Sequence, residues 1–260
     1  MQREPSKQEA IRLAKAGFND VLHNQVRACT APLFWYEPNA PLGERIRANG
    51  TIFFIRFADN VIGITADHVY TGFLDAASEN PRVRSAIFNQ DFDMQSRLIA
   101  RSSELDIATF DVPTVSVPTF GGADAHRPIE WPPPTPTENR GVIFVGYPGD
   151  FREEAGQNLF WTPYSVFTVS AVVAPDRIMV QFDRSYLIDP LNRGLPPENL
   201  WLGGLSGCPL FALWESKATG VVHIELSGVG VEFNEALEIA RFAPISVVGI
   251  NGSVDANAAA

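Results

Sequence analysis

The chain has 260 residues, of which 45% are hydrophobic and 19% are charged, enough for a substantial core and too apolar for a chain that is disordered throughout. Its net charge is -10, so phosphate neutralisation cannot drive binding and we expect no nucleic-acid partner. The 20 Gly, 20 Pro, 18 Phe and 5 Trp favour a mostly β fold with tight turns over a helical bundle.

The first 44 residues are expected to form a helix and a lead-in to the first strands. Apolar side chains recur there with helical spacing, at Ile11, Ala14, Phe18, Val21, Leu22 and Val26. The pattern predicts an amphipathic helix over residues 7–27 that packs on the rest of the chain or docks a protein partner. No signal peptide or membrane span is seen, which predicts a cytoplasmic protein that does not bind membranes.

Short apolar runs with polar or proline punctuation predict strands along the rest of the chain. Residues 51–57 and 61–65 should form a hairpin around Ala58, Asp59 and Asn60. Further strands are expected at residues 85–88, 97–101, 107–112, 141–148, 167–173, 178–182 and 222–226.

Residues 126–140 contain five prolines and are predicted to be an extended, solvent-facing linker between two halves. A proline-rich stretch can also be a ligand for a module that reads polyproline helices, but one internal run favours a connector. Residues 251–260 are expected to be a flexible tail.

Three local patterns carry chemistry. His68 directly follows an apolar strand, Asp106 opens another strand, and Ser206 lies in the glycine-rich stretch Gly203-Gly-Leu-Ser-Gly-Cys-Pro209. A serine hydroxyl becomes a nucleophile when an imidazole takes its proton, and an acid must orient that imidazole and stabilise its charged form. Glycines around the serine let the backbone N–H groups of Gly204 and Ser206 face the oxyanion of a tetrahedral intermediate.

These motifs resemble those of the trypsin-like, or chymotrypsin-fold, serine peptidases over residues 45–250. The family places its histidine in Thr-Ala-Ala-His, here Thr65-Ala-Asp-His68, and its acid in Asp-Ile-Ala, here Asp106-Ile-Ala108. Its nucleophile lies in Gly-Asp-Ser-Gly-Gly-Pro, here Gly204-Leu-Ser-Gly-Cys-Pro209. The order His, Asp, Ser is also that of the family.

The resemblance implies two six-stranded antiparallel Greek-key β-barrels with the triad between them. The first barrel would span residues 45–125 and hold His68 and Asp106, and the second would span residues 141–250 and hold Ser206. It also implies a primary pocket that includes Leu200 and Trp201. A strand edge at residues 226–231 would pair with substrate through Leu226, Ser227 and Gly228.

Departures from the family pattern refine these expectations. Leu205 replaces the acid that pairs with a new N-terminus in many secreted members, so activation by that route is not expected. Leu200 replaces the acid that selects basic substrates, which predicts an apolar or small side chain before the scissile bond. Asp67 beside His68 is either a solvated loop acid or a group that favours the charged imidazole.

The sequence therefore predicts a serine endopeptidase that cleaves polypeptides through an acyl-enzyme on Ser206. The alternatives are a peptidase-like scaffold that binds peptides or a protein partner without turnover and, third, acyl transfer on esters. His23, His126 and His223 are interpreted as structural. The two cysteines, Cys29 and Cys208, cannot form a disulfide framework, and neither a metal site nor a cofactor is predicted.

Overall fold

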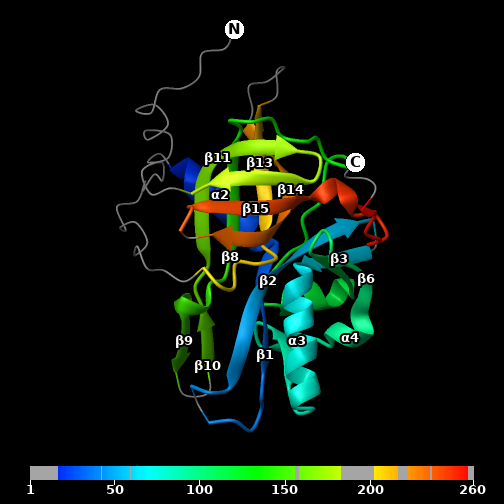
Figure 1. The fold of residues 1–260 in the computed structure, drawn as a ribbon, viewed down its shortest axis with the longest axis vertical. Coiled ribbons are helices and arrows are strands. Elements are labelled where there is room, and N and C mark those ends of the chain that lie inside the picture. The colour runs from blue at the N-terminus through cyan, green and yellow to red at the C-terminus, as the bar shows by residue number, and fades with distance from the viewer. Residues whose placement is uncertain are drawn as a thin grey trace.

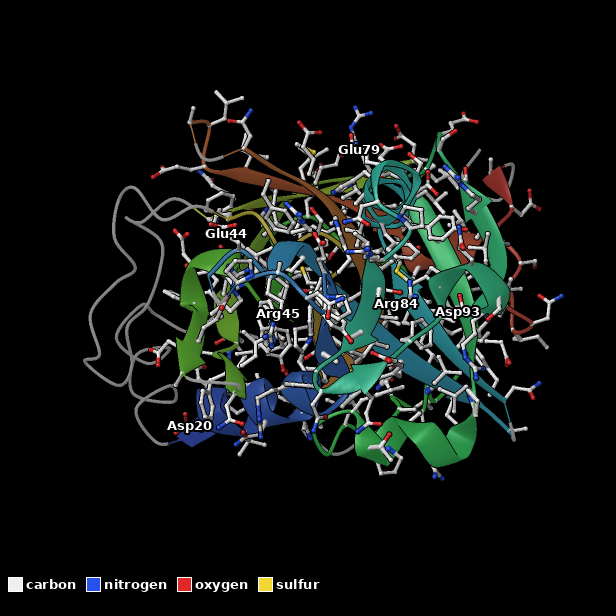
Figure 2. All side chains as sticks on the ribbon, turned by 90° about the horizontal axis from the view of Figure 1, so that it is seen from below. Asp20, Glu44, Arg45, Glu79, Arg84 and Asp93 are labelled. Carbon is white, nitrogen blue, oxygen red and sulfur yellow. The ribbon has the colours of Figure 1, made fainter. Side chains whose placement is uncertain are left out.

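The computed structural model describes residues 17–41, 43–58, 60–155, 158–182, 202–215, 222–234 and 236–256. The fold is mostly β, in two units that lie one above the other in Figure 1, with a barrel at the top and a sheet below. Exposed acids such as Asp20, Glu44, Glu79 and Asp93 lie on the outside of the molecule (Figure 2), where water solvates them.

The first unit is a seven-stranded antiparallel sheet in the order β5-β4-β1-β2-β3-β7-β6. The expected hairpin at residues 51–65 is confirmed, because β2 and β3 pair in the register Phe53↔Ile64 to Phe57↔Asn60. Among the described residues, the end strands β5 and β6 are not paired with each other, so this unit is not a closed barrel. Its strands are β1 (Thr30–Tyr36), β2 (Ile46–Phe57), β3 (Asn60–Thr65), β4 (Arg84–Ile87), β5 (Gln90–Asp91), β6 (Leu98–Ser102) and β7 (Ile107–Val112).

The second unit is a closed, six-stranded antiparallel barrel in the order β11-β12-β15-β14-β13-β8. A separate hairpin of β9 (Arg152–Ala155) and β10 (Asn158–Trp161) leaves the barrel and lies beside β1 and β2 (Figure 1). The barrel strands are β8 (Gly141–Gly146), β11 (Tyr164–Ala174), β12 (Arg177–Gln181), β13 (Pro209–Glu215), β14 (Val222–Asn234) and β15 (Ile239–Pro244).

Few helices accompany the strands. Of the predicted N-terminal helix, the structure describes α2 (Asn19–Ala28), which packs against β8 through the buried Leu22 and Val26. Val21 was expected on the same apolar face but is 56% exposed. The other helices are α3 (Asp67–Glu79), α4 (Met94–Arg97) and the short 3-10 helices at residues 114–119, 149–151 and 245–247. No helix within the described ranges is long and apolar enough to cross a membrane.

Strand β2 is buried on both faces and so contributes to two cores. Ile52 and Phe54 point into the core between the sheet and α3, whereas Phe53 and Ile55 point into a core shared with the barrel. Alternate residues of a strand face opposite sides, and burying each such side chain stabilises the fold by roughly 1.5–3 kcal/mol. The shared core also contains Phe211 and Val229 of the barrel, and it holds the two units together.

The linker and the C-terminal segment are packed more closely than expected. Trp131 packs edge-on against Phe57, its Nε1–H donates to the Val248 carbonyl at 2.9 Å, and Pro133 and Pro136 are buried. The hydroxyl of Thr109 donates to the Gly252 carbonyl at 2.6 Å. The 126–140 segment is therefore not simply solvent-facing, and the expected flexible tail is packed against the sheet as far as Ala256.

Candidate active site

His68 lies in the first turn of α3, just after β3 ends at Thr65. Val69, Tyr70 and Phe73 of the same helix are buried against the first sheet, which fixes the start of the helix. The His68 side chain is 49% exposed. The imidazole is therefore held on a rigid element and remains open to solvent.

Asp106 lies in the turn between β6 and β7 and contacts His68 at two points. Its Oδ1 accepts the backbone N–H of His68 at 2.8 Å, and its Oδ2 is 2.7 Å from Nδ1 of the ring. The first contact satisfies an N–H that a helix start leaves without a partner, because the N-cap residue Ala66 has no side-chain acceptor. The second places the Nδ1 proton toward the acid and leaves Nε2 available as a base.

Asp67 precedes His68 and is buried, so it is not the solvated loop acid that one of the two sequence interpretations offered. It is 3% exposed and forms an ion pair with Arg101 of β6, with Nε to Oδ1 and Nη2 to Oδ2 both at 2.7 Å. An acid at the first helical position also interacts favourably with the helix dipole. The pair ties the start of α3 to the sheet edge beside Asp106.

Ser206 lies in a tight turn between residues 202 and 209. The Leu205 N–H donates to the Leu202 carbonyl at 3.1 Å and the Cys208 N–H to the Leu205 carbonyl at 2.9 Å. Gly204 and Gly207 have φ of 104° and 87°, values that residues with a Cβ rarely adopt. Leu205 and Cys208 are buried while Ser206 is partly exposed, so the turn presents the serine outward.

The serine turn belongs to the barrel unit by sequence, but it is hydrogen-bonded to the first sheet through Thr51. The Thr51 N–H donates to the Ser206 carbonyl at 2.8 Å, and its hydroxyl donates to the Gly204 carbonyl at 2.8 Å. The Thr51 carbonyl in turn accepts the hydroxyl of Thr65 at 2.6 Å. Thr65 is the last residue of β3, the strand that leads to His68.

Packing at Gly50 shows that the serine turn and α3 are neighbours. A Cβ at this glycine would lie 3.2 Å from the Ser206 carbonyl oxygen and 2.7 Å from both γ-carbons of Val69. Ser206 is thus beside the residue that follows His68. The structure therefore brings the backbone of the serine turn near the start of α3, where His68 and Asp106 are hydrogen-bonded, and no hydrogen bond joins the Ser206 hydroxyl to the His68 ring among the described residues.

In the serine turn, backbone N–H groups that donate a hydrogen bond alternate with N–H groups that do not. The Leu205 N–H is used within the turn, whereas the N–H groups of Gly204 and Ser206 donate to no acceptor among the described residues. Two unengaged N–H groups two residues apart beside a serine can hydrogen-bond one negatively charged oxygen.

The predicted substrate-binding residues are distributed differently. Leu200 and Trp201 lie outside the described residues. Leu226, Ser227 and Gly228 are buried in β14, and Gly228 pairs with both β13 and β15. The residue of β14 that contacts the serine turn is instead Gly230, whose carbonyl accepts the Gly207 N–H at 2.7 Å and whose N–H donates to Cys208 at 2.8 Å.

Beyond Gly230, β14 continues to Asn234 and pairs only with β15 among the described strands, since its pairing with β13 ends at Pro209↔Val229. Among the described strands, residues 231–234 of β14 therefore have a partner on one side only, and this segment lies farther along the chain than the predicted Leu226, Ser227 and Gly228. The expected position of the edge rests on its distance in sequence from Ser206. That distance does not locate the edge, because the length of the connection between β13 and β14 decides which residues of β14 pair with β13.

The cysteines are free, buried thiols. Burial raises the pKa of Cys29 to about 12, and burial also raises the pKa of Cys208 well above its usual range. Neither thiol ionises near neutral pH, so neither is an effective nucleophile or metal ligand. Within the described ranges, no group of three or more His, Cys, Asp or Glu side chains is placed to hold a metal ion.

Comparisons with known proteins add little to this geometry. No family model and no curated protein matches the sequence. A solved structure described as "Aromatic interactions drive the coupled folding and binding of the intrinsically disordered Sesbania mosaic virus VPg protein" aligns with 83% of this chain and 85% of that chain. Its identity is 13% and its TM-score 0.43, values too low to support an argument. The β-barrel-rich architecture itself is consistent with a trypsin-like fold.

Proposed function

We propose that the protein is a serine endopeptidase with Ser206 as nucleophile, His68 as base and then acid, and Asp106 as the residue that orients His68. The observation that carries the proposal is the double contact of Asp106 with the backbone and ring of His68, next to a serine turn with two unengaged N–H groups. An acid that only capped the helix would not need to reach Nδ1.

In the proposed reaction, His68 Nε2 takes the hydroxyl proton of Ser206 while Oγ attacks the scissile carbonyl. The N–H groups of Gly204 and Ser206 stabilise the resulting oxyanion. His68 then gives its proton to the leaving amine, which departs and leaves an acyl-enzyme. A water molecule, deprotonated by the same imidazole, hydrolyses the ester and restores the serine.

The proposal also holds that the two units are related barrels of the trypsin-like type. In the barrel, the pairing runs β13-β8-β11-β12-β15-β14, and in the first unit it runs β4-β1-β2-β3-β7-β6. In chain order, each half therefore pairs its six strands as fourth, first, second, third, sixth and fifth. This shared order supports two related units, with the first opened between its fourth and fifth strands and extended by β5.

An activity-based probe tests the nucleophile directly. A fluorophosphonate should label the wild-type protein and the control Ser78→Ala, which changes an exposed serine of α3, but not Ser206→Ala. Labelling that survives in Ser206→Ala would refute the assignment. A peptide library should be cleaved by the same two proteins that are labelled.

The second candidate function is a peptidase-like scaffold that binds peptides without turnover. The edge at residues 231–234, which has no second partner in the part of the chain that the structure describes, favours it equally, because an extended peptide can add to such an edge whether or not it is cleaved. Peptide binding without probe labelling or cleavage would support the scaffold. Ester hydrolysis without peptide cleavage would instead support the third hypothesis, acyl transfer on esters.

A further inference from the structure

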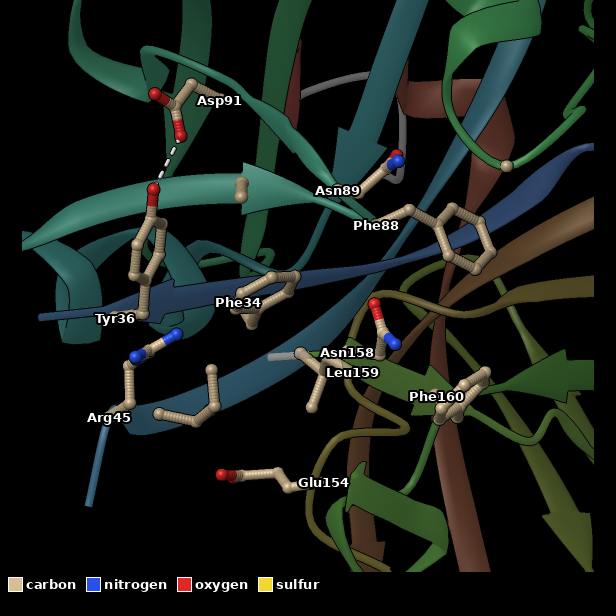
Figure 3. A pocket seen from close by; sticks show the side chains of 13 residues that line it. Phe34, Tyr36, Arg45, Phe88, Asn89, Asp91, Glu154, Asn158, Leu159 and Phe160 are labelled. Atoms are coloured by element: carbon tan, nitrogen blue, oxygen red, sulfur yellow. Dashed lines mark hydrogen bonds between the residues drawn. The ribbon is translucent and has the colours of Figure 1, made fainter. Parts of the chain in front are cut away.

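A cavity of about 440 Å³ lies between the β9–β10 hairpin and the β5-β4-β1-β2 side of the first sheet (Figure 3). Its volume falls in the range of pockets that bind small molecules or large side chains, roughly 300–1,000 Å³. It does not include His68, Asp106 or Ser206.

Aromatic and aliphatic side chains form much of its lining. Phe34 of β1 lies at its centre in Figure 3, and Leu159 and Phe160 of β10 line the opposite wall. The Phe34 ring is held in place by the rings of Tyr36 and Trp161, with centroids 5.9 Å and 5.4 Å away. Phe160 is 54% exposed, so a ligand that covered it would remove apolar surface from water.

The charged side chains that line the cavity differ in whether they form hydrogen bonds. Asp91 accepts the Tyr36 hydroxyl at 2.8 Å, and Glu154 accepts the Gly43 N–H at 3.0 Å. By contrast, the guanidinium of Arg45 forms no hydrogen bond or ion pair with any described residue, and its Nε is buried. Asp91 and Glu154 keep their negative charges, so the cavity is not positive overall. Arg45 is nevertheless the charged lining side chain whose N–H donors have no acceptor among the described residues, and a carboxylate matches the fork of N–H groups on a guanidinium.

The cavity and the serine turn share the segment that connects β8 to β9. The Tyr147 ring packs edge-on against Phe88 of the cavity, with centroids 5.7 Å apart, and the Tyr147 carbonyl accepts the amide of Asn49 at 2.8 Å. Two residues on, the Gly149 N–H donates to the Gly203 carbonyl at 2.9 Å. The cavity and the serine turn are therefore both in contact with this one short segment.

We propose that this cavity binds a segment of the polypeptide substrate in which an aromatic residue adjoins an acidic one, with the ring between Phe34 and Phe160 and the carboxylate on Arg45. The assignment of the segment to a substrate rests on the proposed peptidase function. The binding itself does not depend on catalysis.

The test uses the full chain carrying Ser206→Ala, so that bound peptides are not consumed. The probes are acetyl-Trp-Glu-amide, acetyl-Trp-Gln-amide and acetyl-Ala-Glu-amide, titrated at low ionic strength and followed by ¹⁵N–¹H NMR. Acetyl-Trp-Glu-amide should bind about tenfold more tightly than either of the other two, since it alone supplies both the ring and the charge-assisted hydrogen bonds. The signals that shift should be those of the cavity lining.

Two variants of this parent separate the contributions. Arg45→Gln should abolish the preference for Glu over Gln, and Phe160→Ala should weaken both Trp peptides about equally. Arg177→Gln, at an exposed arginine of the barrel, is the matched control and should leave all three affinities unchanged. Equal urea midpoints for the parent and its variants exclude loss of folding as the cause.

Equal affinity for the Glu and Gln peptides, or a preference that persists in Arg45→Gln, would overturn the proposal, as would shifts confined to other surfaces. The two proposals can fail separately. If the cavity binds as expected while fluorophosphonate does not label Ser206, the binding site stands and the peptidase falls. The reverse result leaves the peptidase without this subsite.

Discussion

At the scale of single residues, Asp106 shows how one side chain can serve folding and chemistry together. Its backbone has a φ of 56°, a left-handed value that Asp tolerates better than most residues. This turn directs one carboxylate oxygen to the start of α3 and the other to the imidazole. The orientation of His68 therefore depends on the same group that completes the helix.

Asp106→Asn should lower kcat by about 10³ to 10⁴-fold if the proposed mechanism holds. The amide oxygen can still accept the His68 N–H, but an NH₂ group facing Nδ1 forces the ring proton onto Nε2, where the base is needed. The measurement is kcat against a peptide substrate, with urea unfolding to show that the fold persists. Asp111→Asn, at an exposed acid of β7, is the control. A loss of less than tenfold in Asp106→Asn would contradict the assigned role.

The three candidate catalytic residues could be predicted from the sequence because each is embedded in a short motif with a chemical reason. The residues that assemble them could not. Thr51 and Gly50 lie in an ordinary strand sequence, and their contacts with the serine turn span more than 150 residues of chain. Such contacts follow from how two units pack, which no local pattern encodes.

At the scale of elements, α3 (Asp67–Glu79) is the main element that was not predicted from the sequence. Its apolar residues Val69, Tyr70, Phe73 and Leu74 follow helical spacing and pack on one face, but the run is only 13 residues long and directly follows a strand, and no element was predicted there. Strand β11 was predicted as a strand, but it turns the polar residues Thr168 and Ser170 inward. Their hydroxyls donate to the carbonyls of Gln181 and Thr137, which makes a polar inward face acceptable.

The Asp67–Arg101 ion pair should stabilise α3 measurably. Arg101→Met should reduce the free energy of unfolding by about 2–3 kcal/mol, because it leaves a buried carboxylate without its cation. The double variant Asp67→Asn, Arg101→Met should lose less than the sum of the two single variants. Urea unfolding of all four proteins gives the coupling energy.

The exposed pair Arg177–Asp176, taken through the same cycle, should give a coupling of less than about 1 kcal/mol. If the Asp67–Arg101 coupling is no larger than that of the exposed pair, the inference that this ion pair holds the start of α3 is wrong.

At the scale of the whole molecule, His126 lies where the two units meet. Its backbone N–H donates to Phe54 of the first sheet at 2.8 Å, and its ring packs edge-on against Phe211 of the barrel at 4.9 Å. The sequence interpretation of His126 as structural is consistent with this position. Burial lowers the pKa of His126 from 6.5 to about 4, so its ring is neutral in the folded protein near neutral pH.

This burial predicts a loss of stability in mild acid. Below pH 6.5 the unfolded chain protonates His126 while the folded chain does so only near pH 4, so the free energy of unfolding falls as the pH is lowered between these values. From pH 6.5 to 4.5 the contribution is about 2 kcal/mol. His126→Gln should remove that part of the slope, as measured by urea unfolding at each pH. An unchanged slope would show that the ring is not buried as a neutral group.

The bonds made by Thr51 connect activity to the completion of folding. A molecule whose two units have not yet docked lacks the contacts that shape the serine turn, so its Ser206 carbonyl and the adjacent N–H groups are not in position. Under the proposed peptidase function, a newly made chain would then be unable to attack its unfolded neighbours before the two units dock. Docking of the two units would thus delay activity until folding is complete.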